Sequence, residues 1–322
     1  MTRITAYEIK NHQGDTLSIT NFGARIIRWQ TKVGDESRNI VLGYPDLEDY
    51  LTDPFFMGAI VGPYANRIAN ACYTVDEKEV TLSANEGKNQ LHGGKGALDS
   101  QFWQCSYHDD SSLTLTCQLK DGFNGYPGNI SIKVNYEISP TSELIINIEV
   151  NTAKATIVGP TAHPYFNLNA KQQSTEHNLQ VNSSNYTPVN KHGIPLGEIQ
   201  PVEGSHYDFS SPTTISKANN NQSLDDNFIL SLQDTTIEKI ALKHASLTSQ
   251  DKKLTLQVSS NYPAIQVYAG KHLNKPFTPN QGICLEPQFC PDSPNQLAFP
   301  FHMTSPNGPL KTEIRYALIK AQ

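Results

Sequence analysis

Two residues of this sequence could exchange protons with a bound molecule. His163 lies in TAHPYFNLN, residues 161–169, and Glu286 lies in GICLEPQF, residues 282–289. Glu286 follows an apolar Ile-Cys-Leu run, and burial at the end of such a strand would raise the pKa of its carboxyl group. The two residue types indicate general acid–base chemistry. By themselves they leave two alternatives open, a packed core histidine and an edge carboxylate that faces solvent.

Three further stretches carry side chains that could hold a polar ligand. His92 in NQLHGG precedes two glycines, which permit tight turns and close approach of a ligand. Arg67 in ANRIAN offers a fixed fork of hydrogen-bond donors. The acidic pair of LDDNF, Asp225 and Asp226, offers acceptors. Taken singly, such residues are more often a loop histidine, a structural ion pair and solvated turn acids.

The elements that must position these side chains are strands. Apolar and polar residues alternate over 113–119, 131–138, 144–150 and 253–259, a period typical of half-buried strands. Glycine and proline separate the runs, and no convincing amphipathic helix of 12 residues occurs. Many strands separated by turns predict an all-β fold, a large antiparallel β-sandwich.

The length and composition predict one domain over residues 1–322. Of the 322 residues, 37% are hydrophobic and 17% are charged, and Ser, Thr, Asn and Gln make up much of the rest. This composition suits strands and loops better than helices. No linker-like segment or fixed-period repeat divides the chain, which argues against a propeller or solenoid.

The charge and cysteine content restrict the partners and the compartment. The net charge is −6 and no basic run occurs, so we expect no nucleic-acid partner. No apolar stretch approaches 18 residues, and the N-terminus lacks the apolar core of a signal peptide, so we expect no membrane association and a cytoplasmic location. The five scattered cysteines are expected to be free thiols.

Several other chemistries are excluded by spacing. The sequence contains no GxSxG elbow, no glycine-rich phosphate loop and no HExxH motif. The ten histidines do not pair at metal-ligand spacing, and Cys284 and Cys290 lack partner ligands nearby in the sequence. We therefore expect a site that works through histidine and carboxylate, without a metal or cofactor.

Taken together, the motifs resemble the aldose 1-epimerase (galactose mutarotase) family nearly from end to end. The resemblance rests on their order, which is NFGARI, GPYANRIAN, NEGKNQLHGG, GYPG, TAHPYFNLN, YTPVNKHGIPLGEI, LDDNF, IQVYAG, GICLEPQ and PDSPN. It implies a large β-sandwich that interconverts the α and β anomers of free aldoses, with galactose or glucose as substrate and no cofactor. It also implies the site residues, which are Glu286 as general base, His163 as general acid, and Asn66, Arg67, His92, Asp225 and Gln266 around the sugar.

The sequence departs from the family pattern at three positions near these motifs. Pro63 stands where the family usually has arginine, Ala162 where it has asparagine, and Pro164 where it has a small or polar residue. The departures remove no proposed catalytic group, but they leave the preferred aldose open. Two rivals remain, an epimerase relative acting on another or a phosphorylated aldose, and a catalytically silent sugar-binding protein. We expect a monomer or homodimer.

The acid–base mechanism predicts how activity depends on pH. Glu286 must be ionised to accept a proton and His163 protonated to donate one, so activity should follow a bell-shaped curve. With ordinary pKa values of about 4.3 and about 6.5 for these side chains, the acid limb would belong to the glutamate and the alkaline limb to the histidine. A neighbouring anionic Glu286 should raise the pKa of His163.

Overall fold

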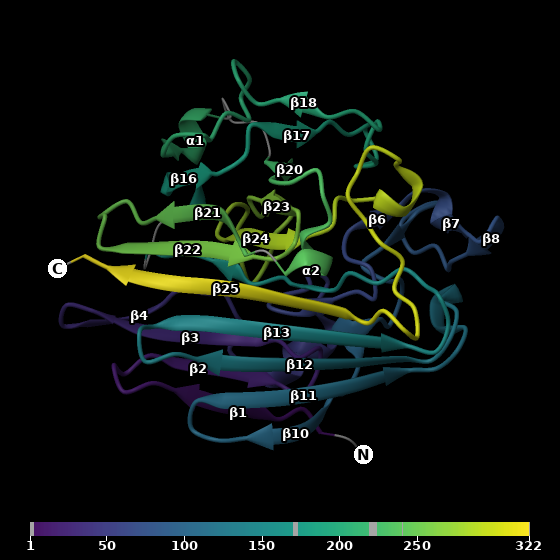
Figure 1. Ribbon diagram of the computed structural model, residues 1–322. Coiled ribbons are helices and arrows are strands. Elements are labelled where there is room, and N and C mark those ends of the chain that lie inside the picture. The colour runs from purple at the N-terminus through teal and green to yellow at the C-terminus, as the bar shows by residue number, and fades with distance from the viewer. Residues whose placement is uncertain (1–2, 170–172, 219–223, 240, 322) are drawn as a thin grey trace.

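A nine-stranded antiparallel sheet forms one layer of the computed structural model, which describes residues 3–169, 173–218, 224–239 and 241–321 (Figure 1). In spatial order its strands are β10 (Gln104–His108), β11 (Ser112–Leu119), β12 (Ile130–Ile138), β13 (Glu143–Thr152), β25 (Leu310–Lys320), β22 (Leu254–Ser260), β21 (Leu242–Thr248), β16 (Asn178–Val181) and β19 (Thr213–Thr214). The four alternating runs of the sequence form β11, β12, β13 and β22, so these strand predictions are confirmed.

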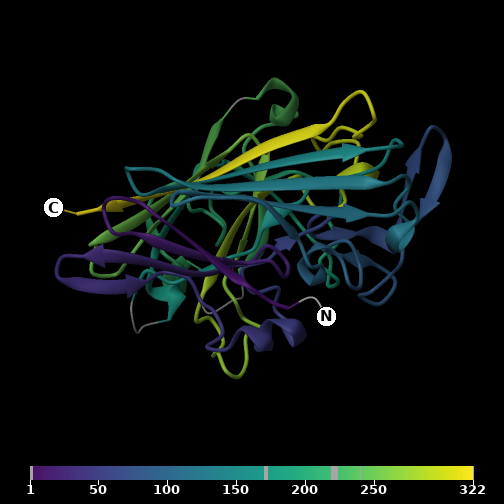
Figure 2. The same cartoon turned by 90° about the horizontal axis from the view of Figure 1, so that it is seen from below.

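Two smaller antiparallel sheets cover the inner face of this layer, as the view from below shows (Figure 2). One contains β1 (Ala6–Lys10), β2 (Thr16–Thr20), β3 (Ile26–Val33) and β4 (Glu36–Asn39). The other has the order β15 (Tyr165–Phe166), β24 (Ile283–Gln288), β23 (Ala264–Tyr268), β20 (Asp225–Ile229), β17 (Asn185–Thr187) and β18 (Gln200–Pro201). The largest apolar cluster contains residues of all three sheets and lies between them, which confirms the antiparallel β-sandwich.

Short elements join the sheets. Three two-stranded ladders consist of β5 (Ile60–Val61) with β14 (Thr161–Ala162), β6 (Arg67–Ile68) with β9 (Gln90–Leu91), and β7 (Cys72–Val75) with β8 (Lys78–Thr81). The α-helices of the described residues are α1 (Ile215–Ala218) and α2 (Thr235–Glu238), each a single turn. The 3-10 turns span Leu47–Thr52, Ala69–Ala71, Leu98–Ser100, Phe123–Gly125, Ser174–Glu176 and Ser293–Asn295.

The six-stranded sheet presents an apolar face to the core and a polar face to the opposite side. In β24, Ile283 and Leu285 join the core, whereas Cys284, Glu286 and Gln288 alternate with them on the other face. In β23, Gln266 lies directly across from Glu286 in the ladder and therefore shares that polar face. A strand buried on both sides explains why GICLEPQ does not show the simple polar–apolar alternation of the outer strands.

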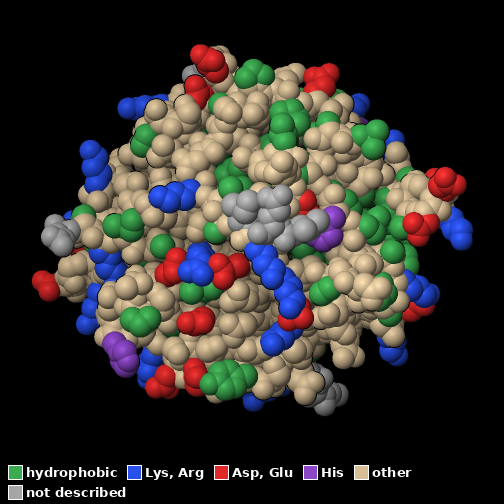
Figure 3. All heavy atoms as spheres, in the orientation of Figure 1, with side chains coloured by type: hydrophobic (Ala, Val, Ile, Leu, Met, Phe, Trp, Pro, Cys, Tyr) green, Lys and Arg blue, Asp and Glu red, His purple; other side chains and the backbone are tan. Residues whose placement is uncertain are grey.

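The surface and the cysteines complete the description. On the face shown in Figure 3, acidic and basic side chains are interspersed rather than separated by sign. No helix within the described ranges is long and apolar enough to span a membrane. All five cysteines are free thiols, as their number and scatter predict.

Candidate active site

His163 lies at a crossing between two sheets. The preceding residues form β14, which pairs with β5, and the ladder continues as His163 N–H donates to the Ala59 carbonyl at 2.8 Å. Two residues later β15 begins and pairs with β24, placing Tyr165 opposite Cys284. The imidazole, whose residue is only 5% exposed, is thereby held over the polar face of β24.

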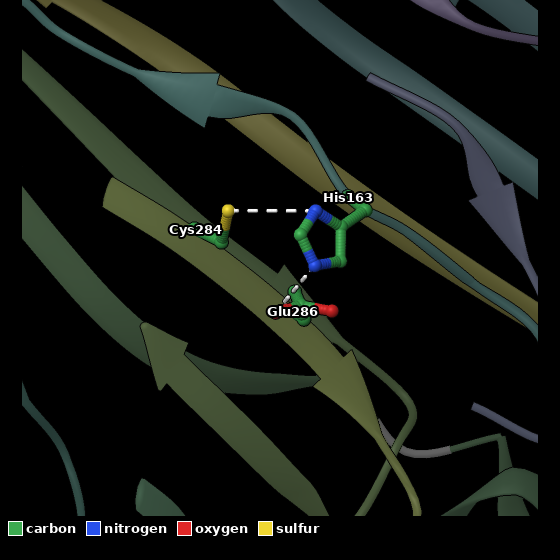
Figure 4. Close-up of side chains that lie close together, drawn as sticks. All are labelled: His163, Cys284 and Glu286. Atoms are coloured by element: carbon green, nitrogen blue, oxygen red, sulfur yellow. Dashed lines mark hydrogen bonds and ion pairs between the residues drawn. The ribbon is translucent and has the colours of Figure 1, made fainter. Parts of the chain in front are cut away.

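Glu286 meets His163 on that face. Its Oε1 lies 3.6 Å from Nε2 of the imidazole, and Cys284 Sγ lies 3.6 Å from Nδ1, so the ring sits between the two side chains (Figure 4). Glu286 is 2% exposed, and its Oε2 is buried with no protein hydrogen-bond partner among the described residues. The alternative of an edge carboxylate facing solvent is therefore wrong.

Burial moves the two pKa values of this pair in opposite directions. It raises the pKa of Glu286 well above its ordinary value, and the nearby Asp225 carboxylate raises it further. Burial lowers the pKa of His163 to about 4. The expectation of a raised histidine pKa is therefore wrong, because desolvation of the imidazolium outweighs its backbone hydrogen bond and the attraction of Asp53. Burial therefore disfavours the charged form of each group, which makes the carboxylate a stronger base and the imidazolium a stronger acid.

Asn66 and His92 are joined by the β6–β9 ladder, which brings two motifs far apart in the sequence together. His92 N–H donates to the Asn66 carbonyl at 3.0 Å, and Asn66 N–H donates to His92 Nδ1 at 3.1 Å. This bond makes Nδ1 an acceptor, and burial lowers the pKa of His92 well below its ordinary value. A neutral His92 therefore carries its proton on Nε2 and can donate it to a ligand oxygen.

The glycine after His92 is required by close packing. Gly93 has a φ of +85°, and a Cβ placed there would lie 2.2 Å from the Gly62 carbonyl oxygen. Any other residue would therefore collide with the backbone and adopt a strained conformation. This explains why LHGG holds His92 in a sharp turn at the mouth of the site.

Arg67 forms a structural ion pair and also lines the site. Its Nε and Nη2 donate to the two carboxylate oxygens of Glu86 at 2.7 and 2.8 Å, a bidentate arrangement. The pair fixes the plane of the guanidinium while the side chain still lines the cavity. The sequence analysis missed Glu86, because a loop acid in NEG carries no signal of its own.

Asp225 and Gln266 form the opposite wall. Gln266 Nε2 donates to Asp225 Oδ1 at 2.7 Å, which fixes the amide so that its Oε1 is a buried acceptor with no partner among the described residues. Asn227 pairs with Gln266 in the ladder, and both of its side-chain amide atoms are buried with no partner in the part of the chain that the structure describes. Both residues line the larger pocket, so these amide atoms can form hydrogen bonds to a polar ligand there.

A further wall comes from a loop that the sequence analysis did not single out. Phe56 has a φ of +55°, and its ring centroid lies 4.7 Å from that of His92 and 6.1 Å from that of His163. The buried carboxylate of Asp53 holds this loop by accepting from Met57 N–H at 2.7 Å and from Arg25 at 2.6 Å. The loop therefore presents a fixed aromatic surface beside both histidines.

The structure thus brings all seven residues implied by the family resemblance into one place. All seven line a pocket of about 250 Å³, which adjoins a second pocket of about 550 Å³. The smaller contains His163, Glu286 and His92, and the two share Asn66, Arg67, Asp225 and Gln266. A cavity of this size, with an acid–base pair on its floor and polar groups around its rim, is suited to a small polyhydroxylated molecule.

Of the three departures from the family pattern, Ala162 packs in the hydrophobic core and Pro63 touches the turn at Gly93. Pro164 lies between β14 and β15. None of these residues contributes to the two pockets as far as the described residues define them. They act on the site only through the backbone that carries His163 and His92.

Removing the polar walls should weaken catalysis and binding together. We expect Arg67→Ala and Asp225→Ala each to cost about 1.5–3 kcal/mol in transition-state stabilisation, because each removes charged hydrogen bonds to the ligand or to its neighbours. This corresponds to roughly a 10- to 100-fold lower kcat/KM. Steady-state kinetics with galactose would measure it.

Arg315→Ala is the matched control, since Arg315 is ion-paired with Glu143 and Glu313 on the nine-stranded sheet. It should leave kcat/KM unchanged. Wild-type kinetics in folded Arg67→Ala and Asp225→Ala proteins would place the ligand elsewhere.

Comparisons with known proteins agree with this geometry. The family model described as aldose 1-epimerase matches residues 5–317. An aldose 1-epimerase of Escherichia coli is 34% identical over 308 residues, which cover 91% of this chain and 88% of that protein. A galactose mutarotase of Homo sapiens is 31% identical over 310 residues, covering 92% and 82%.

Two solved structures share the whole fold. An aldose epimerase homologue from C. elegans has a TM-score of 0.92 at 25% identity, covering 99% of this chain and 100% of that one. A galactose 1-epimerase from Lactobacillus acidophilus has a TM-score of 0.85 at 26% identity, covering 100% and 99%. With the matched family model and the relatives above 30% identity, these findings show that the chain belongs to the aldose 1-epimerase family of isomerases.

Proposed function

We propose that this protein interconverts the α and β anomers of free aldohexoses such as galactose and glucose. The observation that carries the proposal is the His163–Glu286 pair, whose Nε2 and Oε1 lie 3.6 Å apart on the floor of the 250 Å³ cavity. Anomer exchange requires one group that takes a proton and one that gives a proton at neighbouring oxygens. A pair this close can reach both oxygens bonded to C1 of one sugar.

In the proposed reaction, the Glu286 carboxylate takes the proton of the C1 hydroxyl and His163 Nε2 gives a proton to the ring oxygen. The bond between C1 and the ring oxygen breaks, leaving an open-chain aldehyde. After rotation about the C1–C2 bond, the ring closes on the other face of the carbonyl and both protons return. Because the pKa of Glu286 is raised and that of His163 is lowered, proton transfer toward the glutamate favours ring opening.

The remaining groups would hold the sugar for this exchange. His92 offers an Nε2–H donor, Gln266 and Asp225 offer acceptors, and the ring of Phe56 offers an apolar surface. Holding the sugar fixed against the acid–base pair itself accelerates the reaction, since it removes the entropic cost of bringing the reacting groups together.

The charges around the two pockets support a neutral sugar rather than a phosphorylated one. Arg67 is engaged by Glu86, and the other cationic wall residue is Lys191. The carboxyl groups of the same walls are Glu86, Asp225, Asp226 and Glu286. A phosphate would require clustered cations, and these walls present more acids than bases.

Polarimetry tests the proposal directly. Purified protein added to freshly dissolved α-galactose or α-glucose should accelerate the decay of optical rotation to its equilibrium value. A panel of free aldoses and their 6-phosphates separates the proposal from its first rival. If the protein bound sugars but accelerated none of these decays, the sugar-binding rival would replace it.

Activity should survive chelators and strong reductants. The proposed proton transfers use a carboxyl and an imidazole, and the five cysteines are free thiols that need no disulfide to hold the fold. We expect unchanged initial rates after dialysis against a chelator and in excess dithiothreitol. A rate that fell in chelator and returned with one added metal would contradict this expectation.

A further inference from the structure

Cys284 adds a thiol to the acid–base pair and has no part in the reaction proposed above. It lies two residues before Glu286 on the same face of β24, and it is fully buried. One ligand atom from each of His163, Cys284 and Glu286 lies within 4.8 Å of those of the other two. The three side chains come from two distant parts of the chain, so the spacing of these residues in the sequence does not predict the cluster.

The geometry points to a binding site for a thiophilic divalent cation such as Zn²⁺, formed by His163, Cys284 and Glu286, at which the metal inhibits the proposed epimerase rather than assisting it. This inference rests in part on the proposed function, because inhibition follows from occupation of the acid–base pair. A cation held there would bind the Glu286 carboxylate. The proposed general base could then no longer accept a proton from a sugar.

The donor set fits zinc, and so does the separation of its sulfur and nitrogen ligands, whereas Glu286 would have to turn toward a cation bound between them. Tetrahedral zinc holds sulfur at about 2.3 Å and nitrogen at about 2.0–2.1 Å, which separates the two ligand atoms by about 3.6 Å. Cys284 Sγ and His163 Nδ1 are 3.6 Å apart. Thiolate and imidazole together select zinc over magnesium or calcium, which prefer oxygen ligands.

A second observation is independent of these distances. Glu286 Oε2 is buried and has no hydrogen-bond partner among the described residues, so it can turn to a third ligand position without breaking a bond. Three protein ligands leave a fourth position open toward the cavity for water or a sugar oxygen.

Binding requires that the thiol lose its proton. The S–H bond of Cys284 breaks, the proton passes to the buffer, and a sulfur–metal bond forms, with no change of oxidation state. A proton held on Glu286 is released in the same way. Metal uptake should therefore release protons, which a weakly buffered solution with an indicator dye would record.

Cobalt substitution tests the site without turnover. Co²⁺ added to the protein should produce the near-ultraviolet charge-transfer band of a cobalt thiolate, and Zn²⁺ should abolish that band. The half-exposed Cys72 and Cys105 are the other accessible thiols, so the Cys72→Ser/Cys105→Ser protein is the matched control and should keep the band. Cys284→Ala should lose it, and Cys284→Ser serves if the alanine variant does not fold.

Inhibition is measured separately. Zn²⁺ should slow mutarotation of galactose at least tenfold in the wild type and the control variant, competitively with the sugar and reversibly by a chelator. Cys284→Ala should lose most of this sensitivity. A missing cobalt band, or a band that persists in Cys284→Ala, overturns the metal site even if the protein is an epimerase. A correct band in a protein that accelerates no sugar would instead overturn the proposed function alone.

Discussion

Glu286→Gln should lower turnover by about 10²–10⁴ while galactose still binds. Glutamine keeps the size of the side chain and its place on β24, but it cannot take or return a proton. The loss is that of one general acid–base group and corresponds to about 2.7–5.4 kcal/mol of activation free energy. Glu286 is the carboxylate of this pocket that contacts His163, whereas Glu86 and Asp225 accept hydrogen bonds from Arg67 and Gln266.

The measurement combines polarimetric kinetics with calorimetric titration of galactose. Glu313→Gln is the matched control, since Glu313 is a carboxylate ion-paired with Arg315 outside the cavity, and it should retain wild-type turnover. Near wild-type turnover in folded Glu286→Gln would remove the glutamate from the mechanism. Loss of sugar binding along with turnover would show instead that the substitution disturbs the cavity.

His163→Asn should lower turnover by a similar factor of about 10²–10⁴ and remove the acid limb of the pH profile. The pair transfers protons productively while it holds one proton. As pH falls through the His163 pKa of about 4, both groups become protonated and no base remains. As pH rises through the raised pKa of Glu286, both lose their protons and no acid remains. Activity should therefore be bell-shaped, with the histidine on the acid side and the glutamate on the alkaline side.

This assignment reverses the expectation drawn from ordinary pKa values and is tested by the residual profiles of the two variants. Glu286→Gln should keep the acid limb and lose the alkaline limb, and His163→Asn should do the opposite. His244→Asn controls for the loss of a buried histidine of low pKa outside the cavity and should keep both limbs. If the alkaline limb disappeared in His163→Asn, the histidine and not the glutamate would have the higher pKa when sugar is bound.

Much of the fold followed from local pattern. The alternation in β11, β12, β13 and β22 predicted half-buried strands because a strand turns successive side chains to opposite faces. The family motifs also named the seven site residues, and the structure gathers all seven. The single domain over residues 1–322, the cytoplasmic location and the monomer or homodimer stay predictions.

Other features had no local signal. Phe56 belongs to a loop whose shape depends on a buried Asp53–Arg25 pair formed across 28 residues. Glu86 is an ordinary loop acid until the β6–β9 ladder places Arg67 beside it. In the sequence, Cys284 looks like one apolar residue of a buried strand. Only its proximity to His163 makes it a candidate metal ligand. Such contacts join segments that the sequence separates by up to 121 residues.

By itself the sequence determined which residue types this protein can use, which strands carry them and which family it belongs to, since these depend on order and on period-two alternation. Tertiary structure alone decided how those residues act. It buried His163 and Glu286 3.6 Å apart, and the shared burial, not the residue types, raised the pKa of the glutamate and lowered that of the histidine. The physical reason is that a pKa depends on desolvation and on neighbouring charges, and both are properties of packing between distant segments.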